Sequence, residues 1–332
     1  MRRAAFIVML ACPRLLPALA AGADFLRAEI PARPAGMAGS FTAFHDDANA
    51  FLWNPAALAH AKEPMLSATH FNSIIDTTFD QAAFVQPLTI AHAAGGLGLG
   101  VQYSSTANLF ETDLQGNDKG VIDNHDFVLQ TGYGFMVTPR FALGLGLKGF
   151  SSQLAEYKSR GFAADVGMQS LIIDRLELGI SFVELGVQEA YDSQADPLPT
   201  LLRLGLKGTL VDSAEVLILG AAEIDKPWTT SDPILVTTGA EYWFQKTLAL
   251  RAGWRFGADT GNLTIGAGLK WAGLSFDYAY SSMGDIGIAH RISIWAELGK
   301  VSEKAKLFVP ELGADVTPPP PPRHIGVDPE RR

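Results

Sequence analysis

Hydrophobic and polar positions alternate with a period of two along most of the chain, from about residue 64 to residue 299. In the segment TLALRAGWRF, for example, Leu248, Leu250 and Trp254 share one face, whereas Arg251 and Arg255 share the other. A period of two predicts β-strands whose side chains alternate between two environments. One face of these segments is apolar and often aromatic at its ends. The other face carries Gly, Ser, Thr and isolated charges.

Fourteen segments follow this pattern, and most are about 9–13 residues long by inspection of the sequence. They lie near residues 64–73, 79–87, 95–105, 124–135, 140–152, 158–170, 174–184, 200–210, 214–224, 235–245, 247–257, 262–271, 273–282 and 288–299. A tilted strand needs roughly 9–11 residues to cross a bilayer, whereas globular strands cluster near 5–6. Bacterial barrels have an even number of strands. We therefore predict an all-β membrane protein, a 14-stranded antiparallel outer-membrane β-barrel.

The connections between these segments alternate between short and long, with the fifth as an exception. Tight turns such as VTP (137–139) and VDS (211–213) contrast with long connections such as residues 106–123. Outer-membrane barrels combine short periplasmic turns with long outside loops, so both termini are predicted to be periplasmic. A soluble β-sandwich is the alternative. Aromatic residues near strand ends favour the membrane barrel because they suit interfacial girdles; these are Trp243, Trp254, Trp271, Tyr278 and Tyr280.

The alternation also predicts which side chains face lipid and which face the lumen. Trp254, Leu263 and Tyr278 belong to the apolar face and are expected to contact lipid. The charged residues of the opposite face are expected to point into the lumen, in paired or solvated networks, since a lone buried charge is costly. These are Arg203, Lys207, Arg251, Arg255, Lys270 and Asp277.

The regions outside the barrel differ in character. Residues 1–20 combine Arg2 and Arg3, an apolar stretch and a small-residue cleavage site at residues 18–20, as in a signal peptide. Residues 21–63 form a plug segment, residues 64–299 the barrel, and residues 300–332 a periplasmic tail whose prolines at 318–322 favour polyproline II. The chain has one cysteine, Cys12, in the signal segment, so the mature chain would hold no disulfide. A net charge of −9 argues against nucleic acid as a partner.

Residues 36–59, GMAGSFTAFHDDANAFLWNPAALA, form a short helical patch before the strands. Asp46 or Asp47 is expected to cap a short helix that runs to about Trp53, and Asn54 to cap a second turn with Pro55 at its first position. The glycines Gly36 and Gly39 allow the backbone to approach another surface closely. Because a large barrel has a lumen to fill, we place this patch inside the barrel's mouth as a plug.

No pattern of catalytic or metal-binding residues accompanies these elements. His45, Asp46 and Asp47 could ligate a metal, but no second cluster completes such a site. The histidines and serines form no recognisable nucleophilic arrangement. We therefore expect no enzymatic activity and no cofactor.

The plug segment resembles the opening of the PorV/PorQ family, which lies within the FadL-like outer-membrane barrels. Members open with a Gly-Met-Gly-Gly-Ala-like stretch, an Asp-Asp-Ala step and a Trp-Asn-Pro-Ala run. Residues 36–40, 46–48 and 53–58 match these features, although Ala57 replaces the commoner glycine and the proline-rich tail extends beyond the last strand.

Two functions follow from this resemblance. The PorV/PorQ likeness implies a protein-secretion component of type IX kind, with secretion-machinery proteins and exported cargo as partners besides outer-membrane lipid. The wider FadL-like likeness implies a channel for hydrophobic small molecules, which pass a plugged lumen and leave through a gap in the wall.

Overall fold

The computed structural model describes residues 23–301, except residues 74–75, 91–92, 108, 113–114, 116, 123, 192–194, 231, 259–261 and 283–286. Four short helices come first: η1 (Asp24–Arg27), α1 (Ala32–Gly36), η2 (Ala50–Leu52) and η3 (Pro55–His60). The strands are β1 (Met65–Asn72), β2 (Thr77–Ile90), β3 (Ala93–Thr106), β4 (Phe110–Thr112), β5 (Asp118–Val121), β6 (Asn124–Thr138), β7 (Phe141–Leu154), β8 (Tyr157–Ile173), β9 (Leu176–Gln188), β10 (Leu201–Asp212), β11 (Val216–Pro227), β12 (Leu235–Phe244), β13 (Leu248–Phe256), β14 (Leu263–Trp271), β15 (Leu274–Ser282) and β16 (Ile288–Glu297). No helix in this part of the chain is long and apolar enough to cross a membrane.

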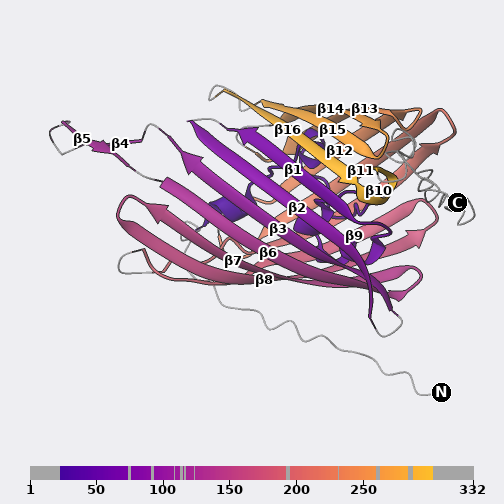
Figure 1. Cartoon of the computed structure of the whole chain (residues 1–332), viewed down its shortest axis with the longest axis horizontal. Helices are drawn as coiled ribbons and strands as arrows, with labels where there is room; N and C mark the ends of the chain where they lie inside the picture. The colour runs from indigo at the N-terminus through magenta and orange to yellow at the C-terminus, as the bar shows by residue number, and fades with distance from the viewer. Residues whose placement is uncertain are drawn as a thin grey trace, which may run out of the picture.

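Fourteen of these strands close into one antiparallel barrel, as the alternation predicts (Figure 1). Each strand pairs with its neighbours in sequence order, and β16 pairs with β1 from Glu297 opposite Met65 to His290 opposite Asn72. Closure removes the two free edges of an open sheet, whose backbone groups could not form hydrogen bonds with lipid. Several strands extend beyond their predicted limits, and β8 reaches 17 residues.

The two remaining strands, β4 and β5, form a separate hairpin that the sequence pattern did not predict. The hairpin belongs to the long connection between β3 and β6, and it projects beyond the barrel (Figure 1). We call this the long-loop end, because residues 189–200 and 228–234 also connect strands there. The opposite, short-turn end has tight turns, such as Gln245–Lys246, where both residues have positive φ.

Burial along the strands confirms the predicted faces, with one exception. Trp254, Leu263 and Tyr278 expose 41–43% of their surface on the outer face. Trp243 does not belong to an aromatic girdle, because it faces inward and is 7% exposed. The side chain of Arg251 stacks on it, with the guanidinium carbon 5.5 Å from the ring centroid. A strand-end position therefore does not decide the face of an aromatic residue; register parity does.

The N-terminal part of the described chain lies inside the barrel. It begins at Ala23 among residues of the long-loop end, where Gln102 donates a hydrogen bond to the carbonyl oxygen of Phe25. It then descends through the lumen to β1, which starts at the short-turn end. The predicted signal segment 1–20, most of the tail at 302–332, and with them the predicted periplasmic position of the termini, lie outside the described residues.

Candidate functional site

Residues 31–61 fill the lumen, and we call them the lumen plug. Its first helix, α1, ends where Ala38 and Gly39 adopt positive φ angles of 56° and 83°. The amide of Gly39 donates to the carbonyl oxygen of Pro34 at 2.9 Å, which closes the helix end. A Cβ at position 36 would lie 3.1 Å from the Cα of Gly266 in β14. Gly36 thus allows the close approach that the sequence predicts, and Gly39 allows the turn that follows α1.

The second half of the plug confirms one predicted cap and corrects the other. Asn54 accepts a hydrogen bond from the amide of Ala56, and Pro55 occupies the first position of η3, as predicted. Neither Asp46 nor Asp47 caps a helix that reaches Trp53. Asp47 accepts from the amide of Asn49 at 2.8 Å, and only the three-residue η2 follows. Asp46 instead pairs with an arginine, so charge pairing wins over helix capping.

The plug backbone lies against a belt of glycines on the inner wall of the barrel. A Cβ at position 134 would lie 2.7 Å from the amide nitrogen of Ala59 and the carbonyl oxygen of Pro55. A Cβ at any of these glycines would come within 3.2 Å of a plug atom: Gly96, Gly98, Gly134, Gly144, Gly167, Gly179, Gly239, Gly253 and Gly266. The plug is therefore seated directly on the strand backbones, without side chains between them.

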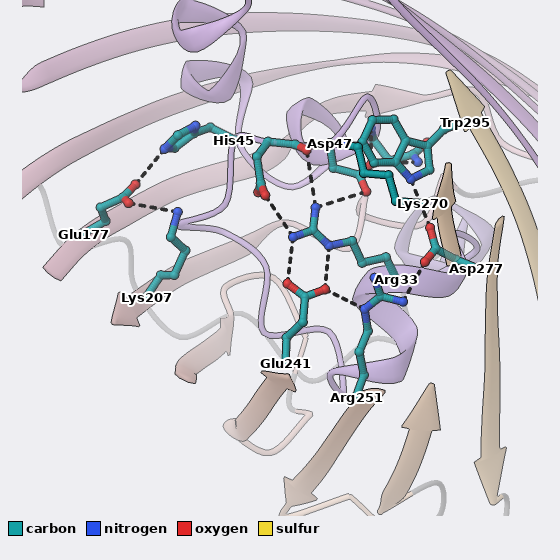
Figure 2. A network of polar contacts seen from close by, with 12 residues as sticks. Arg33, His45, Asp47, Glu177, Lys207, Glu241, Arg251, Lys270, Asp277 and Trp295 are labelled. Carbon is teal, nitrogen blue, oxygen red and sulfur yellow. Dashed lines mark hydrogen bonds and ion pairs between the residues drawn. The ribbon is translucent and has the colours of Figure 1, made fainter. Parts of the chain in front are cut away.

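A buried charge network centred on Arg33 ties the plug to the wall (Figure 2). The Arg33 guanidinium donates twice to Glu241 of β12, at 2.9 and 2.8 Å, and also to Asp46 at 3.0 Å. Arg251 donates to Glu241 at 2.6 Å and to Asp277 at 2.6 Å. Bidentate, charge-assisted bonds of this kind are strong and geometrically specific. Because Arg33, Glu241 and Arg251 are buried, removal of one would leave an uncompensated charge.

The network fixes the ionisation of the plug residues that belong to it. Burial alone would lower the pKa of Arg33, but Asp46 and Glu241 outweigh burial and raise it well above its ordinary value. Partial burial opposes ionisation of Asp46, whose side chain is 50% exposed, yet Arg33 and Lys207 hold its pKa well below the usual range. Burial raises the pKa of Asp47, although Arg33 lies 3.6 Å away. Arg33 and Asp46 are thus charged partners across the plug.

The remaining predicted lumen charges also meet carboxylates inside the barrel. Lys207 pairs with Glu177 at 2.8 Å, and Lys270 with Glu297 at 3.1 Å. Arg203 lies 3.9 Å from Asp225 and stacks over Trp53, while Arg255 pairs with Glu29 just before the plug. The indole of Trp53 donates to the carbonyl oxygen of Gly39. Every predicted lumen charge therefore points inward into a paired arrangement.

A histidine pair lies where the plug approaches Glu177. The rings of His45 and His60 stack at 4.1 Å, and His45 Nε2 lies 2.9 Å from Glu177. Burial lowers the pKa of His60 to about 3, and the charge of His45 acts in the same direction. The described residues hold no group of three His, Cys, Asp or Glu side chains able to bind a metal.

Above the plug, toward the long loops, the lumen contains an apolar cluster. We use this name for seven residues: Ala23, Phe25, Leu26, Val128, Phe150, Ala163 and Leu198. The rings of Phe25 and Phe150 meet edge to face at 5.8 Å. Val128 and Phe150 are opposite each other on β6 and β7, and both are about 5% exposed or less. The N-terminal segment, three strands and one loop residue thus bury apolar surface together inside the lumen.

The barrel wall is interrupted beside this cluster. Residues 176–183 of β9 pair with β10, but the ladder stops there because β10 begins only at Leu201. Glu184 has a φ of 61° and forms a bulge opposite Asp165 of β8. Beyond it, side chains replace the ladder: Thr200 donates to the carbonyl oxygen of Glu184 at 2.8 Å. Leu198, 2% exposed, lies in the loop that precedes β10 and packs into the apolar cluster.

The sequence reasoning missed the plug's central cation, the wall carboxylates and the apolar cluster. Arg33 stands in a proline-rich stretch outside the alternating pattern. The wall residues follow that pattern and could have been found by parity. Lys148 and Ser152 are polar residues of the lumen face, and Phe150 between them shares their side of β7. Leu198 carries no such signal, because it lies in a loop.

No family model matches the sequence, and no curated protein matches it. Solved structures do resemble it. The CymD monoaromatic hydrocarbon channel has a TM-score of 0.56 at 12% identity, over 81% of this chain and 97% of its own. The toluene transporter TbuX of Ralstonia pickettii has a TM-score of 0.55 at 12% identity, over 80% and 98%. A FadL homologue of Pseudomonas aeruginosa has a TM-score of 0.53 at 12% identity, over 81% and 98%.

These likenesses establish the fold, a FadL-like 14-stranded barrel, which is consistent with an outer-membrane protein. They do not show the narrower PorV/PorQ resemblance of residues 36–58, which stays a prediction.

Proposed function

We propose that this chain is an outer-membrane channel for hydrophobic small molecules, which bind in the apolar cluster above a plug that stays in place. The apolar cluster carries this proposal: Phe25 and Phe150 bring two aromatic rings together inside the lumen, on the long-loop side of the plug. Ligand pockets combine an apolar lining with a few polar groups in this way. The similar structures are described as hydrocarbon channels and a toluene transporter, which supports the same class of substrate.

The plug is a poor route for an apolar molecule. Such a molecule would have to displace the buried pairs of Arg33, Glu241 and Arg251, at several kcal/mol for each uncompensated charge. The wall interruption between β9 and β10 offers a route that leaves these pairs intact, because side-chain hydrogen bonds replace the strand ladder there. We take the long-loop end to face the cell exterior. The molecule would then enter from outside and leave sideways, into the membrane.

The PorV/PorQ resemblance supports a second candidate, a secretion component that receives exported cargo. The residues that carry the resemblance argue against a direct role in that task. Asn54 is fully buried and Trp53 is 4% exposed, so neither can contact a cargo protein at the surface. Their positions explain the motif as a device that seats the plug. Cargo binding would have to use the long connection 106–123 instead.

The experiment compares uptake of radiolabelled toluene by cells that express the chain and cells that lack it. Phe150→Ala is expected to reduce the uptake rate about fivefold or more, because the site loses one of its two aromatic walls. Phe162→Ala is the matched control, since Phe162 lies on the adjacent strand and is 67% exposed to the outside. Uptake that is independent of the chain would overturn the channel. Loss of surface cargo after shortening of loop 106–123, with no uptake to lose, would establish the secretion alternative.

A further inference from the structure

The carboxylate of Asp126 lies next to the apolar cluster, on the side of the long loops. Inward-facing positions of β3, β6 and β7 form successive rungs of the ladder. The apolar rung contains Val128 opposite Phe150, and the next rung outward contains Asp126 opposite Ser152. Ser104 faces Asp126 from the other side. A molecule that enters from the long-loop end and buries its apolar part beside Phe150 therefore places its polar end at this rung.

Asp126 is half-buried, and its carboxylate is held by hydroxyl groups rather than by a cation. Ser104 donates to one oxygen at 2.8 Å, and Ser152 donates to the other. Tyr191 bonds to Ser152 from the loop that follows β9. Within the described part of the chain, Asp126 forms no ion pair with Lys or Arg. The negative charge is thus oriented by neutral hydroxyl donors, and the group of opposite charge that acts on it is the imidazole of His125.

The cations of the surrounding lumen are already engaged. Lys148, two rungs below Asp126 on the inner face, contacts both Asp165 and Glu184. Arg27, beside the cluster on η1, pairs with Asp232 at 2.9 Å. The carboxylates Asp126, Asp165, Glu184 and Asp232 therefore outnumber the cations Lys148 and Arg27 here, and Asp126 lies on the rung next to the apolar cluster.

We propose that the apolar cluster and Asp126 together form a site for hydrophobic amines, with the apolar body beside Phe150 and the ammonium group at the Asp126 carboxylate. This inference rests on the proposed channel function and names its substrate class. An ammonium group gains a charge-assisted hydrogen bond at Asp126, a neutral hydroxyl group gains an ordinary one, and a carboxylate is repelled. The expected order of affinity is amine, then alcohol, then carboxylate.

The test uses the full barrel in lipid nanodiscs and three probes of one size: hexylamine, 1-hexanol and hexanoate. Binding of radiolabelled hexanol measures occupancy of the site, after the hexanol that binds to empty nanodiscs is subtracted. The two charged probes are then tested as competitors of hexanol. We expect hexylamine to compete about tenfold or more better than hexanoate, the ratio produced by one favourable and partly buried charge contact. Asp126→Asn should reduce this ratio to about one and leave hexanol binding unchanged, because the amide keeps the shape but loses the charge.

Asp174→Asn is the matched control, since Asp174 lies in an exposed turn at the short-turn end, and it should keep the full ratio. If Asp126→Asn fails to assemble, Ser104→Ala with Ser152→Ala provides a second variant. It retains the carboxylate without its hydroxyl donors, so the preference for the amine should rise. The amine site would be overturned if hexylamine and hexanoate competed equally well in the unaltered barrel, or if Asp126→Asn left their ratio unchanged. Hexanol binding would still support the channel in either case. No hexanol binding at all would overturn the channel, and the amine site with it.

Discussion

Adding one methyl group to the glycine belt, with Gly134→Ala, should loosen the lumen plug while the barrel stays closed. The new Cβ would lie 2.7 Å from the amide nitrogen of Ala59 and from the carbonyl oxygen of Pro55. Ordinary contact begins at 3.4 Å, so two backbone atoms of η3 must move by the difference, 0.7 Å. Backbone atoms cannot rotate away as a flexible side chain can, so the whole helical turn must shift.

The magnitude follows from the overpacked contact alone, because the strand that carries the new methyl group is folded whether or not the plug is seated. Overpacking of a well-packed contact costs about 1–3 kcal/mol. The seated plug should thus lose about 1–3 kcal/mol, which raises the population of unseated plug roughly 5–150-fold. Gly149→Ala is the matched control on β7, because a Cβ there meets nothing within 4 Å. It should leave the plug unchanged.

Maleimide labelling of Ala57→Cys measures this population in a Cys12→Ser background, because Ala57 is 5% exposed in the seated plug. Gly134→Ala should accelerate labelling by the factor above, with an unchanged shift in gel mobility on heating. The close-fit argument is refuted if Gly134→Ala labels as slowly as the parent protein, or if Gly149→Ala accelerates labelling equally.

Three further expectations concern the cap, the lipid face and pH. Asn54→Ala with Pro55→Gly should loosen the plug by about 1–2 kcal/mol, seen as faster labelling at position 57, whereas poor barrel assembly would show that the cap serves folding instead. Leu263→Arg should lower barrel stability by about 2–4 kcal/mol if it lies near the membrane midplane, and an unchanged urea midpoint would contradict its lipid-facing position. Burial lowers the pKa of His60 to about 3 when the plug is seated, whereas the pKa in the unfolded chain is about 6.5. Unfolding therefore takes up a proton between these two pH values. The free energy of unfolding falls by about 1.4 kcal/mol for each unit by which the pH drops through that range. Thermal unfolding at pH 7 and pH 5 should show this loss, His60→Gln should lose less, and an equal loss in both proteins would contradict burial as the cause.

The barrel is predicted well from the sequence because the same physical requirement recurs in every strand. Each strand must present apolar residues to lipid and small or polar residues to the lumen, so the period of two recurs fourteen times. The Asn54–Pro55 cap was predictable for a similar reason, since both residues act within one turn. The inward direction of Arg251 and Asp277 followed from parity alone.

Features that depend on contacts between distant segments could not be read in this way. The pairing of Arg33 with Glu241 joins residues 208 positions apart, and it redirects Asp46 from the predicted cap to an ion pair. The apolar cluster unites η1, three strands and a loop residue, Leu198. The glycines of the belt look like ordinary strand positions until the plug lies against them. Trp243 was misplaced because an aromatic residue suits a girdle and a cation partner equally well.

The most direct test of the account measures toluene uptake while either the plug or the wall interruption is held shut. Met37→Cys with Gly239→Cys would lock the plug, because a Cβ at position 239 lies 2.8 Å from the Met37 Cβ and a small shift allows a disulfide. Gln188→Cys with Asp196→Cys, joined by a reducible bifunctional thiol reagent, would close the wall interruption, where the Gln188 side chain already reaches the Asp196 carbonyl oxygen. The account predicts that uptake continues with the plug locked, stops with the interruption closed and returns on reduction. Uptake that stops when the plug is locked, and continues when the interruption is closed, would contradict it.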